Sequence, residues 1–265
     1  MPTTEFGFRE LTSLLGRDYR PEELRECVSM LGVDVERLDR EKIVMEVFPN
    51  RPDMLGIEGF ARALKGVLGI ETGLPVYKVL NSDIEVLVDP AVKDVRPYIA
   101  AGIVRGLTFT EERLISLMNI QEKLHITHGR NRKKVAIGVH DMGRVAAPFY
   151  YTTSGPSDIS FVPLDMKEKM SLGEILEKHP KGKMYAGALE GMKRFPIILD
   201  RNKNILSFPP IINGELTRLS EGTKDVFIDV TGTDQTAVNQ ALSIIVTSIL
   251  DRGGKAYSVE IGGKK

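Results

Sequence analysis

The sequence contains no tryptophan and only one cysteine, Cys27. One cysteine cannot form an intramolecular disulfide or a multi-cysteine zinc site, and this usage fits a reducing compartment, so we expect a cytoplasmic protein. A basic segment followed by an apolar run is missing at the start, which argues against a secretory signal. No stretch approaches the roughly 20 apolar residues that span a bilayer, so we expect no membrane partner.

An excess of either charge is also missing. Lys+Arg and Asp+Glu both number 36, so the formal net charge is zero and global electrostatics does not indicate nucleic-acid binding. Contact with RNA would need a local patch, and Arg130-Asn-Arg-Lys-Lys134 is such a run. A solvated loop and a phosphate-binding loop both explain this run.

Several catalytic signatures are absent as well. The sequence has no G-x-S-x-G nucleophile elbow, so an α/β-hydrolase is unsupported. It has no G-x-x-x-x-G-K-[ST] motif, which excludes a P-loop NTPase. Cys27 lies in a predicted helix, and an isolated cysteine of this kind usually packs in a core rather than acting as a nucleophile.

The chain does contain enough apolar residues, 42%, to form a sizeable core. Patterning predicts an α+β fold with a small amino-terminal α+β domain, residues 1–90, and a larger mixed α/β domain, residues 91–265. The boundary is placed in a turn-rich stretch rich in proline, glycine and asparagine. In the first domain we predict helices over 8–15, 21–31 and 57–68, and strands over 42–48 and 84–88.

The larger domain alternates strands with helices. A helix capped by Thr110 carries apolar residues at helical spacing up to 124, and the last helix, 238–250, ends at two glycines. Ser171 and Glu174 form a capping-box pattern before a short helix. The predicted strands cover residues 99–107, 134–139, 197–199, 205–208, 227–230 and 256–261, with 197–208 as a hairpin.

Histidines raise the question of a metal. His125 and His128 are three residues apart, and His140 is followed by Asp141, so these groups could bind zinc. Their spacing fits no common zinc signature, and we therefore predict no metal site. The simpler interpretation places His125 at the carbonyl end of its helix, where a cation is favoured.

Two polar stretches indicate a pocket instead. Ser207 and Asn213 flank a rigid Pro-Pro turn. In the strand 227–230, Phe227 and Asp229 should share one face and Ile228 and Val230 the other. Asp229 would then be a carboxylate beside an aromatic ring at the end of a strand, a common place for a ligand. A turn or helix-capping role suits Asp234 better.

Taken together, four segments resemble phenylalanyl-tRNA synthetase beta subunits of the archaeal/eukaryotic branch. The order and spacing agree over nearly the whole chain. The last three segments are similar to motifs of the family's editing domain, called B3/B4. The segments are Phe48-Pro-Asn-Arg-Pro-Asp-Met-Leu-Gly-Ile-Glu-Gly-Phe-Ala-Arg-Ala-Leu64, then Gln121 to Asp141, Ser207-Phe-Pro-Pro-Ile-Ile-Asn213 and Thr223-Lys-Asp-Val-Phe-Ile-Asp-Val-Thr-Gly232.

The resemblance implies hydrolysis of wrongly formed Tyr-tRNA(Phe) within an α2β2 enzyme. Its alpha subunit would perform the aminoacylation with ATP and Mg²⁺, while this chain would need no cofactor. The family's beta subunit continues past Lys265, so we expect a fragment or a free-standing editing module. The alternatives are a non-catalytic tRNA-binding or subunit-assembly module and a histidine-dependent metallohydrolase.

The resemblance also implies roles for particular residues. Asp229 would accept the tyrosine hydroxyl, and this requires a cavity that it shares with Ser207 and a carboxylate not consumed by a salt bridge. Thr231 and Ser207 would position water, the ester or the terminal ribose. His140 would stack on or hydrogen-bond the substrate. The remaining expected contacts are Ile198 as an apolar wall, Asn213 at the substrate, and Arg130, Arg132, Lys133 and Lys134 at the tRNA.

Overall fold

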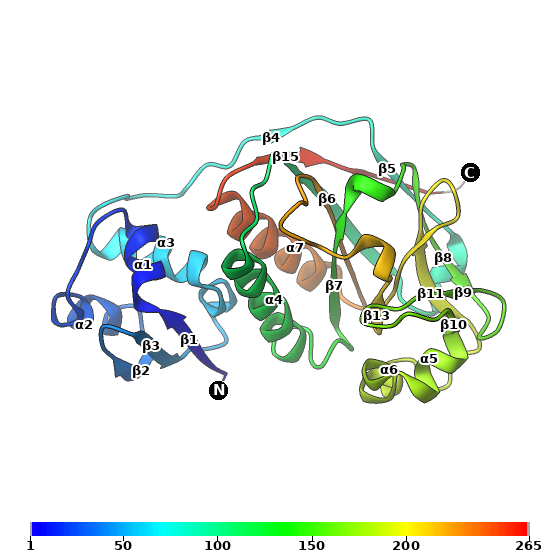
Figure 1. Ribbon diagram of the computed structural model, residues 1–265, viewed down its shortest axis with the longest axis horizontal. Helices are drawn as coiled ribbons and strands as arrows, with labels where there is room; N and C mark the ends of the chain where they lie inside the picture. The colour runs from blue at the N-terminus through cyan, green and yellow to red at the C-terminus, as the bar shows by residue number, and fades with distance from the viewer. Residues whose placement is uncertain (1, 264–265) are drawn as a thin grey trace.

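The computed structural model describes residues 2–263 and consists of a small and a large unit (Figure 1). The small unit is a three-stranded antiparallel sheet in the order β1-β3-β2, packed against helices. Its elements are β1 (Thr3–Gly7), α1 (Phe8–Leu15), α2 (Pro21–Ser29), β2 (Asp34–Leu38), β3 (Lys42–Glu46), the 3-10 helix η1 (Pro52–Leu55) and α3 (Ile57–Val67).

The local sequence explains these elements well. Pro21 occupies the first turn of α2, where its missing N–H removes no helical bond. Ile43 and Met45 in β3 are fully buried while Val44 and Glu46 are partly exposed, as the alternation predicted. The helices predicted at 8–15, 21–31 and 57–68 and the strand at 42–48 are confirmed to within two residues at each end. The strands β1 and β2 were not predicted.

The larger unit contains two main sheets. The first has the order β4-β15-β6-β14-β7, and the second has the order β13-β12-β11-β8-β5-β16. The strands of the first sheet are β4 (Val79–Leu80), β6 (Tyr98–Arg105), β7 (Val135–Asp141), β14 (Val226–Gly232) and β15 (Lys255–Ser258). Those of the second are β5 (Glu85–Val88), β8 (Phe149–Ser154), β11 (Phe195–Leu199), β12 (Ile205–Phe208), β13 (Ile212–Asn213) and β16 (Glu260–Gly263).

Helices cover the outer face of the first sheet. The long helices α4 (Glu111–Ile126) and α7 (Gln235–Leu250) lie between this sheet and the small unit (Figure 1). Thr110 caps α4 by accepting a hydrogen bond from the Arg113 N–H, as predicted. The other elements are η2 (Pro90–Asp94), η3 (Met142–Arg144), β9 (Ser160–Phe161), β10 (Met170–Ser171), α5 (Leu172–Lys178), α6 (Pro180–Tyr185), η4 (Ala186–Ala188) and η5 (Glu215–Thr217).

Strand β14 is central in its sheet, with β6 and β7 as antiparallel neighbours. Ile228 and Val230 belong to the core beneath the helices, whereas Phe227 stacks on Phe149 of the second sheet, with ring centroids 4.2 Å apart. The predicted division of faces along this strand is therefore confirmed. Asp229 consequently faces the space between the two sheets, but from the middle of the strand rather than from its end.

The two units share one continuous core and a partly buried ion cluster. Residues of α1 and α3 pack in the same apolar cluster as residues of α4 and α7. At the end of α7, Arg252 contacts Glu10 and donates from Nε to Glu58 Oε1 at 2.8 Å. Contacts of this kind fix the small unit against the outer helices.

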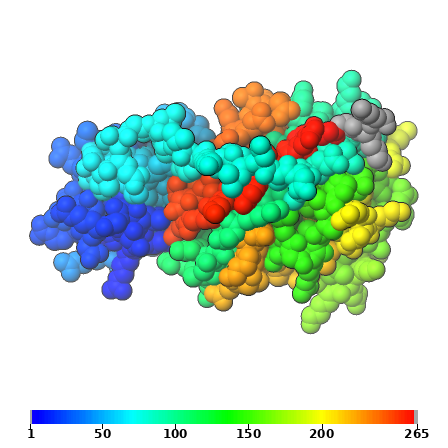
Figure 2. Space-filling view, turned by 90° about the horizontal axis from the view of Figure 1, so that it is seen from above, coloured from blue at the N-terminus to red at the C-terminus, as the bar shows by residue number. Residues whose placement is uncertain are grey.

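Two strands predicted from the sequence, 84–88 and 256–261, are placed differently in the structure. The segment that follows α3 runs over the surface to the larger unit (cyan in Figure 2), where β4 and β5 join its sheets. Residues 79–88, which were predicted within the amino-terminal domain, thus pair with strands of the larger unit. The predicted strand at 256–261 is two strands, since β15 pairs with β6 and β16 pairs with β5 of the other sheet.

Candidate functional site

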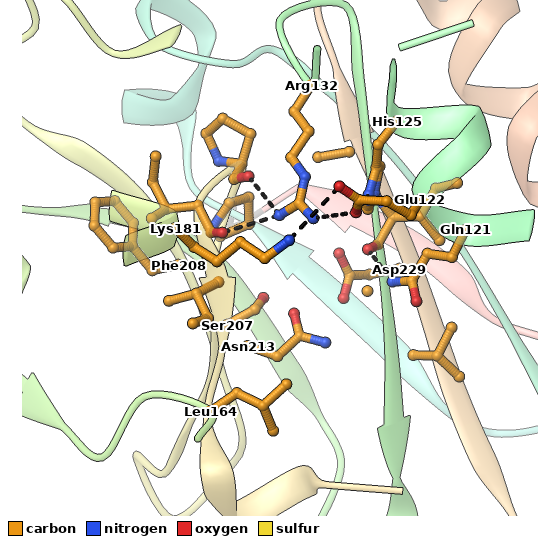
Figure 3. A pocket seen from close by; sticks show the side chains of 18 of the residues that line it. Gln121, Glu122, His125, Arg132, Leu164, Lys181, Ser207, Phe208, Asn213 and Asp229 are labelled. Carbon is orange, nitrogen blue, oxygen red and sulfur yellow. Dashed lines mark hydrogen bonds and ion pairs between the residues drawn. The ribbon is translucent and has the colours of Figure 1, made fainter. Parts of the chain in front are cut away.

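A cavity of about 370 Å³ opens between the two sheets of the larger unit, beside α4 (Figure 3). Its wall comes from both sheets, from α4, and from the turns that follow α4 and β12. Both polar and apolar side chains line it. The polar residues that line it are Asn119, Gln121, Glu122, His125, Arg132, Asp165, Lys181, Ser207, Asn213, Thr217, Arg218, Asp229 and Thr231.

The floor of the cavity combines a carboxylate with hydroxyl and amide groups. Asp229 and Thr231 come from β14, and Ser207 and Asn213 come from the opposed sheet, where they pair across β12 and β13. Ser207, Asn213 and Asp229 point toward the same space (Figure 3). The Ser207 Oγ is buried and has no hydrogen-bond partner among the described residues. A buried hydroxyl left unpaired in this way indicates a place for a ligand or water.

One oxygen of Asp229 is engaged and the other is not. His140 Nε2 lies 2.8 Å from Asp229 Oδ1, and His140 Nδ1 lies 2.8 Å from Thr217 Oγ1. Within the described part of the chain, no hydrogen bond to Oδ2 is found. The predicted cavity beside Asp229 and Ser207 is present. His140 lies within salt-bridge distance of one carboxylate oxygen, and the other oxygen keeps no hydrogen-bond partner among the described residues.

A glycine makes room for this pair. Gly138 of β7 lies opposite Asp229, and a Cβ at Gly138 would lie 2.3 Å from Asp229 Oδ1 and 2.6 Å from His140 Nε2. No side chain fits at that distance, so the absence of a Cβ permits the contact. The glycine within an apolar run, Val-Ala-Ile-Gly-Val-His, was the signal in the sequence that could have indicated it.

Thr231 accepts hydrogen bonds from a buried arginine, Arg96, that the sequence analysis did not single out. Arg96 donates from Nε to Thr231 Oγ1 at 2.9 Å and from Nη2 to the Thr231 carbonyl at 2.8 Å. It also donates to the carbonyl oxygens of Arg132 and Lys133, both at 3.1 Å. Arg96 is 2% exposed, and its burial lowers its pKa to about 10, so it stays protonated at neutral pH.

The other end of the cavity carries charged groups. Arg132 donates to Glu122 Oε2 at 2.8 Å and to the Ile211 carbonyl at 3.0 Å, and its guanidinium lies 4.2 Å from the centre of the Tyr185 ring. Lys181 lies 3.6 Å from the second oxygen of Glu122. The hydrogen bond with His125, and then the charge of Arg132, hold the pKa of Glu122 well below its usual range.

The histidines serve separate local contacts. His125 is buried; its Nε2 accepts from the Ile137 N–H at 2.8 Å, and burial lowers its pKa to about 4. The interpretation of His125 as a cation at the end of a helix is therefore wrong, because the ring is neutral at pH 7. His128 Nε2 lies 3.0 Å from the Ala237 carbonyl. Among the described residues, no group of three or more His, Cys, Asp or Glu side chains could hold a metal ion.

The predicted basic run divides into exposed and engaged residues. Arg130 and Lys133 are exposed, whereas Arg132 turns into the cavity wall and Lys134 lies 3.3 Å from Asp234. The chain reverses here through a left-handed turn, with φ of 50° at Arg130, 53° at Asn131 and 66° at Arg132. Of the four cations in the run, Arg130 and Lys133 are therefore available to a partner. Lys134 is paired with Asp234, and Arg132 lines the cavity.

Two expected site residues lie behind the cavity rather than in its wall. Ile198 is fully buried in the core between the sheets, as the strand partner of Ser207. His140 is likewise fully buried and reaches the cavity through Asp229 and Thr217. Neither is among the described residues that line the cavity. The sequence predicted Ser207, Asn213, Asp229 and Thr231 at the cavity, but it missed Gln121, Glu122, Leu164, Lys181 and Thr217.

Comparison with known proteins identifies the larger unit. The B3/4 domain family matches residues 105–248. The chain is 48% identical over 261 residues to the phenylalanine–tRNA ligase beta subunit of Methanococcoides burtonii, and 49% identical over 262 residues to that of Methanothrix thermoacetophila. Each match covers 98% of this chain and 48% of the relative, so the chain spans about half the length of these relatives.

A solved structure extends the likeness to nearly all of the chain. An amino-terminal fragment of the phenylalanyl-tRNA synthetase beta subunit from Pyrococcus horikoshii superposes with a TM-score of 0.93 at 40% identity. The match covers 99% of this chain and 77% of that fragment, so it includes the small unit as well as the B3/4 domain. The α+β fold with its B3/4 domain is thereby confirmed. The chain belongs to the phenylalanyl-tRNA synthetase beta-subunit family, as an amino-terminal region of the archaeal type with a B3/4 domain.

Proposed function

We propose that the cavity hydrolyses mischarged Tyr-tRNA(Phe), as the editing site of a phenylalanyl-tRNA synthetase beta subunit. One observation carries this proposal: Asp229 presents an uncommitted carboxylate oxygen to the same cavity as the unpartnered Ser207 hydroxyl. A phenol both donates and accepts hydrogen bonds, so it complements a carboxylate beside a hydroxyl. A phenylalanine side chain offers neither.

Such a site would compensate for the weak rejection of tyrosine by the aminoacylation pocket. An apolar pocket rejects an added hydroxyl only by about 10², whereas a site that hydrogen-bonds the hydroxyl discriminates by about 10⁴–10⁵. Phenylalanine would leave the second oxygen of Asp229, Oδ2, desolvated and unpaired, which costs about 1–3 kcal/mol or more. Discrimination here works in the reverse sense from aminoacylation, because the wrong amino acid is the one that fits.

For hydrolysis we propose positioning rather than a covalent intermediate. Ser207 Oγ has no base within hydrogen-bond distance among the described residues, so nothing activates it as a nucleophile. An aminoacyl ester is already reactive, and a held water gains from orientation alone. We assign this orientation to Thr231 and Asn213, which share the cavity wall with Asp229. The proposal requires no metal or cofactor in this chain.

His140 takes a different role from the expected substrate contact. It is fully buried behind Asp229 and is fixed on its other side by Thr217, so we propose that it orients the carboxylate. Ile198 supports Ser207 from the core rather than forming an apolar wall. Both residues thus act through a neighbour that lines the cavity.

The tRNA would approach over the exposed part of the basic turn. Arg130 and Lys133 are the exposed cations of the run, whereas Arg132 and Lys134 are ion-paired. Replacing Arg130 and Lys133 by Ala should flatten the dependence of log K on log salt by roughly 0.7–0.9 for each lost phosphate contact. Arg20→Ala, on the small unit, serves as the control. An unchanged slope would remove the turn from the tRNA interface.

The deciding experiment is deacylation by this chain of Tyr-tRNA(Phe) against Phe-tRNA(Phe). The wild type should clear the tyrosyl ester and spare the phenylalanyl ester. Asp229→Asn should abolish this difference while leaving tRNA binding intact, and Asp94→Asn, at an exposed carboxylate of η2, should change neither rate.

Binding of tRNA without any hydrolysis would contradict editing and favour the alternative, a non-catalytic tRNA-binding or subunit-assembly module. In either case we propose that the chain acts in the cytoplasm, within a longer beta subunit that assembles with an alpha subunit. The family to which the chain belongs supports this assembly. No helix among residues 2–263 is long and apolar enough to cross a membrane.

A further inference from the structure

A buried guanidinium links two parts of the cavity wall that are far apart in sequence. Arg96 precedes β6, does not line the cavity, and makes its four hydrogen bonds to oxygen atoms of Thr231, Arg132 and Lys133. None of these acceptors is a carboxylate. The Asp229 carboxylate favours the charged guanidinium without a hydrogen bond to it. A buried charge whose hydrogen bonds all go to neutral oxygens is costly, so the arrangement calls for a reason beyond packing.

The hydrogen bond from Arg96 to the Thr231 hydroxyl determines how that hydroxyl can bind a ligand. Because Arg96 Nε donates to Thr231 Oγ1, an acceptor position of that hydroxyl is occupied. In the described part of the chain, the Thr231 hydroxyl donates to no other group. Its proton is therefore available beside Asp229, whose carboxylate can only accept. The floor of the cavity thus pairs a donor with an acceptor.

The hydrogen bonds from Arg96 to the carbonyls of Arg132 and Lys133 restrain the left-handed turn. Of its three consecutive residues with positive φ, Asn131 tolerates the left-handed conformation, whereas Arg130 and Arg132 each lose about 1–2 kcal/mol there. Arg96 binds the carbonyl oxygens of the last of them, Arg132, and of Lys133 directly after it. This turn also directs the Arg132 guanidinium to Glu122 at the far end of the cavity. Arg96 itself is fixed from behind, since the Tyr151 hydroxyl donates to its carbonyl at 2.7 Å.

We propose that Arg96 is a positioning residue of this site, which holds the Thr231 hydroxyl and the turn carrying Arg132 in one fixed relationship. The inference rests on the proposed editing function for its catalytic readout, although its structural part stands alone. A lysine can keep the charge of Arg96, but it cannot reach Thr231 and both turn carbonyls with one fork of donors.

The chain offers a control with the same fork of contacts on a more exposed arginine. Arg194 makes the same pair of contacts to another threonine, from Nε to Thr153 Oγ1 at 3.0 Å and from Nη2 to the Thr153 carbonyl at 2.9 Å. Neither of these two residues lines the cavity among the described residues. Arg194→Lys therefore removes an arginine–threonine fork without touching the site.

The experiment compares Arg96→Lys with Arg194→Lys in the deacylation of Tyr-tRNA(Phe) and Phe-tRNA(Phe). Arg96→Lys should lower kcat for the tyrosyl ester by at least about tenfold and reduce the Tyr/Phe rate ratio, since misplacing catalytic groups is costly. Arg194→Lys should leave both within about twofold. Equal effects of the two variants, or a lower kcat with an unchanged ratio, would overturn the proposal.

A double-mutant cycle separates positioning from general destabilisation. In the Arg132→Ala background, the further loss caused by Arg96→Lys should be smaller by at least about threefold, because part of what Arg96 holds is already gone. Fully multiplicative losses would contradict the coupling. If Arg96→Lys does not fold, Tyr151→Phe removes only the hydroxyl that holds the Arg96 carbonyl, and it should shift the Tyr/Phe ratio in the same direction; an unchanged ratio would count against the proposal.

Hydrogen exchange provides a readout that does not depend on editing. The amides of Arg132 and Lys134 donate to the carbonyls of His125 and Gly129 within the turn. Arg96→Lys should accelerate their exchange by about tenfold, while Arg194→Lys should not. Unchanged protection in the turn would overturn the structural part of the proposal. A wild-type chain that fails to hydrolyse Tyr-tRNA(Phe) would overturn the editing function alone.

Discussion

His140 Nε2 lies 2.8 Å from Asp229 Oδ1, and both side chains are almost completely buried. Thr217 lies on the other ring nitrogen at 2.8 Å, so the imidazole is fixed on both sides. Because a carboxylate can only accept, Nε2 carries the proton that is given to Asp229. The ring then holds one oxygen of Asp229 and turns the other toward the cavity.

Replacing His140 by Ala should impair both stability and discrimination. The substitution leaves a buried carboxylate oxygen without its hydrogen-bond donor, which costs about 1–3 kcal/mol or more. The Tyr/Phe deacylation ratio should fall because Asp229 is no longer oriented. Urea unfolding measures the first effect and single-turnover deacylation the second. His140→Gln, which keeps a donor, should recover part of the ratio, and equal ratios for the two variants would count against an orienting role.

Gly138→Ala should break the same contact from the neighbouring strand. Its Cβ would lie within 3 Å of both Asp229 Oδ1 and His140 Nε2, so the pair must separate. We expect a loss of about 1–3 kcal/mol of stability, typical of overpacking, together with loss of tyrosine clearance. Gly187→Ala is the control, since nothing lies within 4 Å of a Cβ at that position. A Gly138→Ala protein of normal activity would show that the contact is dispensable.

Ser207→Ala should separate stability from activity. The Ser207 Oγ is buried without a partner in the described structure, so its removal breaks no hydrogen bond and should leave the melting temperature unchanged or higher. Clearance of the tyrosyl ester should nevertheless fall. Ser248→Ala removes another buried, unpaired hydroxyl, one that lines a different cavity, and should stabilise similarly without affecting deacylation. A large loss of stability in Ser207→Ala would contradict the assignment of a free hydroxyl.

Protein stability should fall as pH drops below about 6.5. Burial lowers the pKa of His125 to about 4 from an ordinary 6.5, so the unfolded chain binds a proton that the folded chain excludes. The free energy of unfolding therefore decreases between pH 6.5 and 4, by at most about 1.4 kcal/mol for each pH unit. Urea unfolding between pH 5 and 6.5 measures this slope above the range of ordinary carboxylates. His125→Gln should flatten it and His128→Gln should not; a slope retained in His125→Gln would contradict the cause.

Prediction from sequence worked best where the pattern was local. The long helix that ends at residue 250, the capping box at Ser171, and the hairpin of β11 and β12 follow from spacing within a few residues. The division of β14 into a Phe227–Asp229 face and an Ile228–Val230 face also follows from strand alternation. The prediction of a single strand at 256–261 was wrong because the chain passes from one sheet to the other at this point. Alternation carries no information about the partner strand.

The sequence by itself determined the long helices and most of the longer strands, the family, and the polar residues Ser207, Asn213, Asp229 and Thr231 that lie at the cavity. Only the tertiary structure decided that Ser207 and Asp229 face each other from two sheets, that His140 binds Asp229 rather than a substrate, and that Arg132 turns inward. The physical reason is that periodicity reports which side of an element is buried. It does not report which buried groups meet, because that depends on sheet register, on the space left by Gly138, and on the distant guanidinium of Arg96.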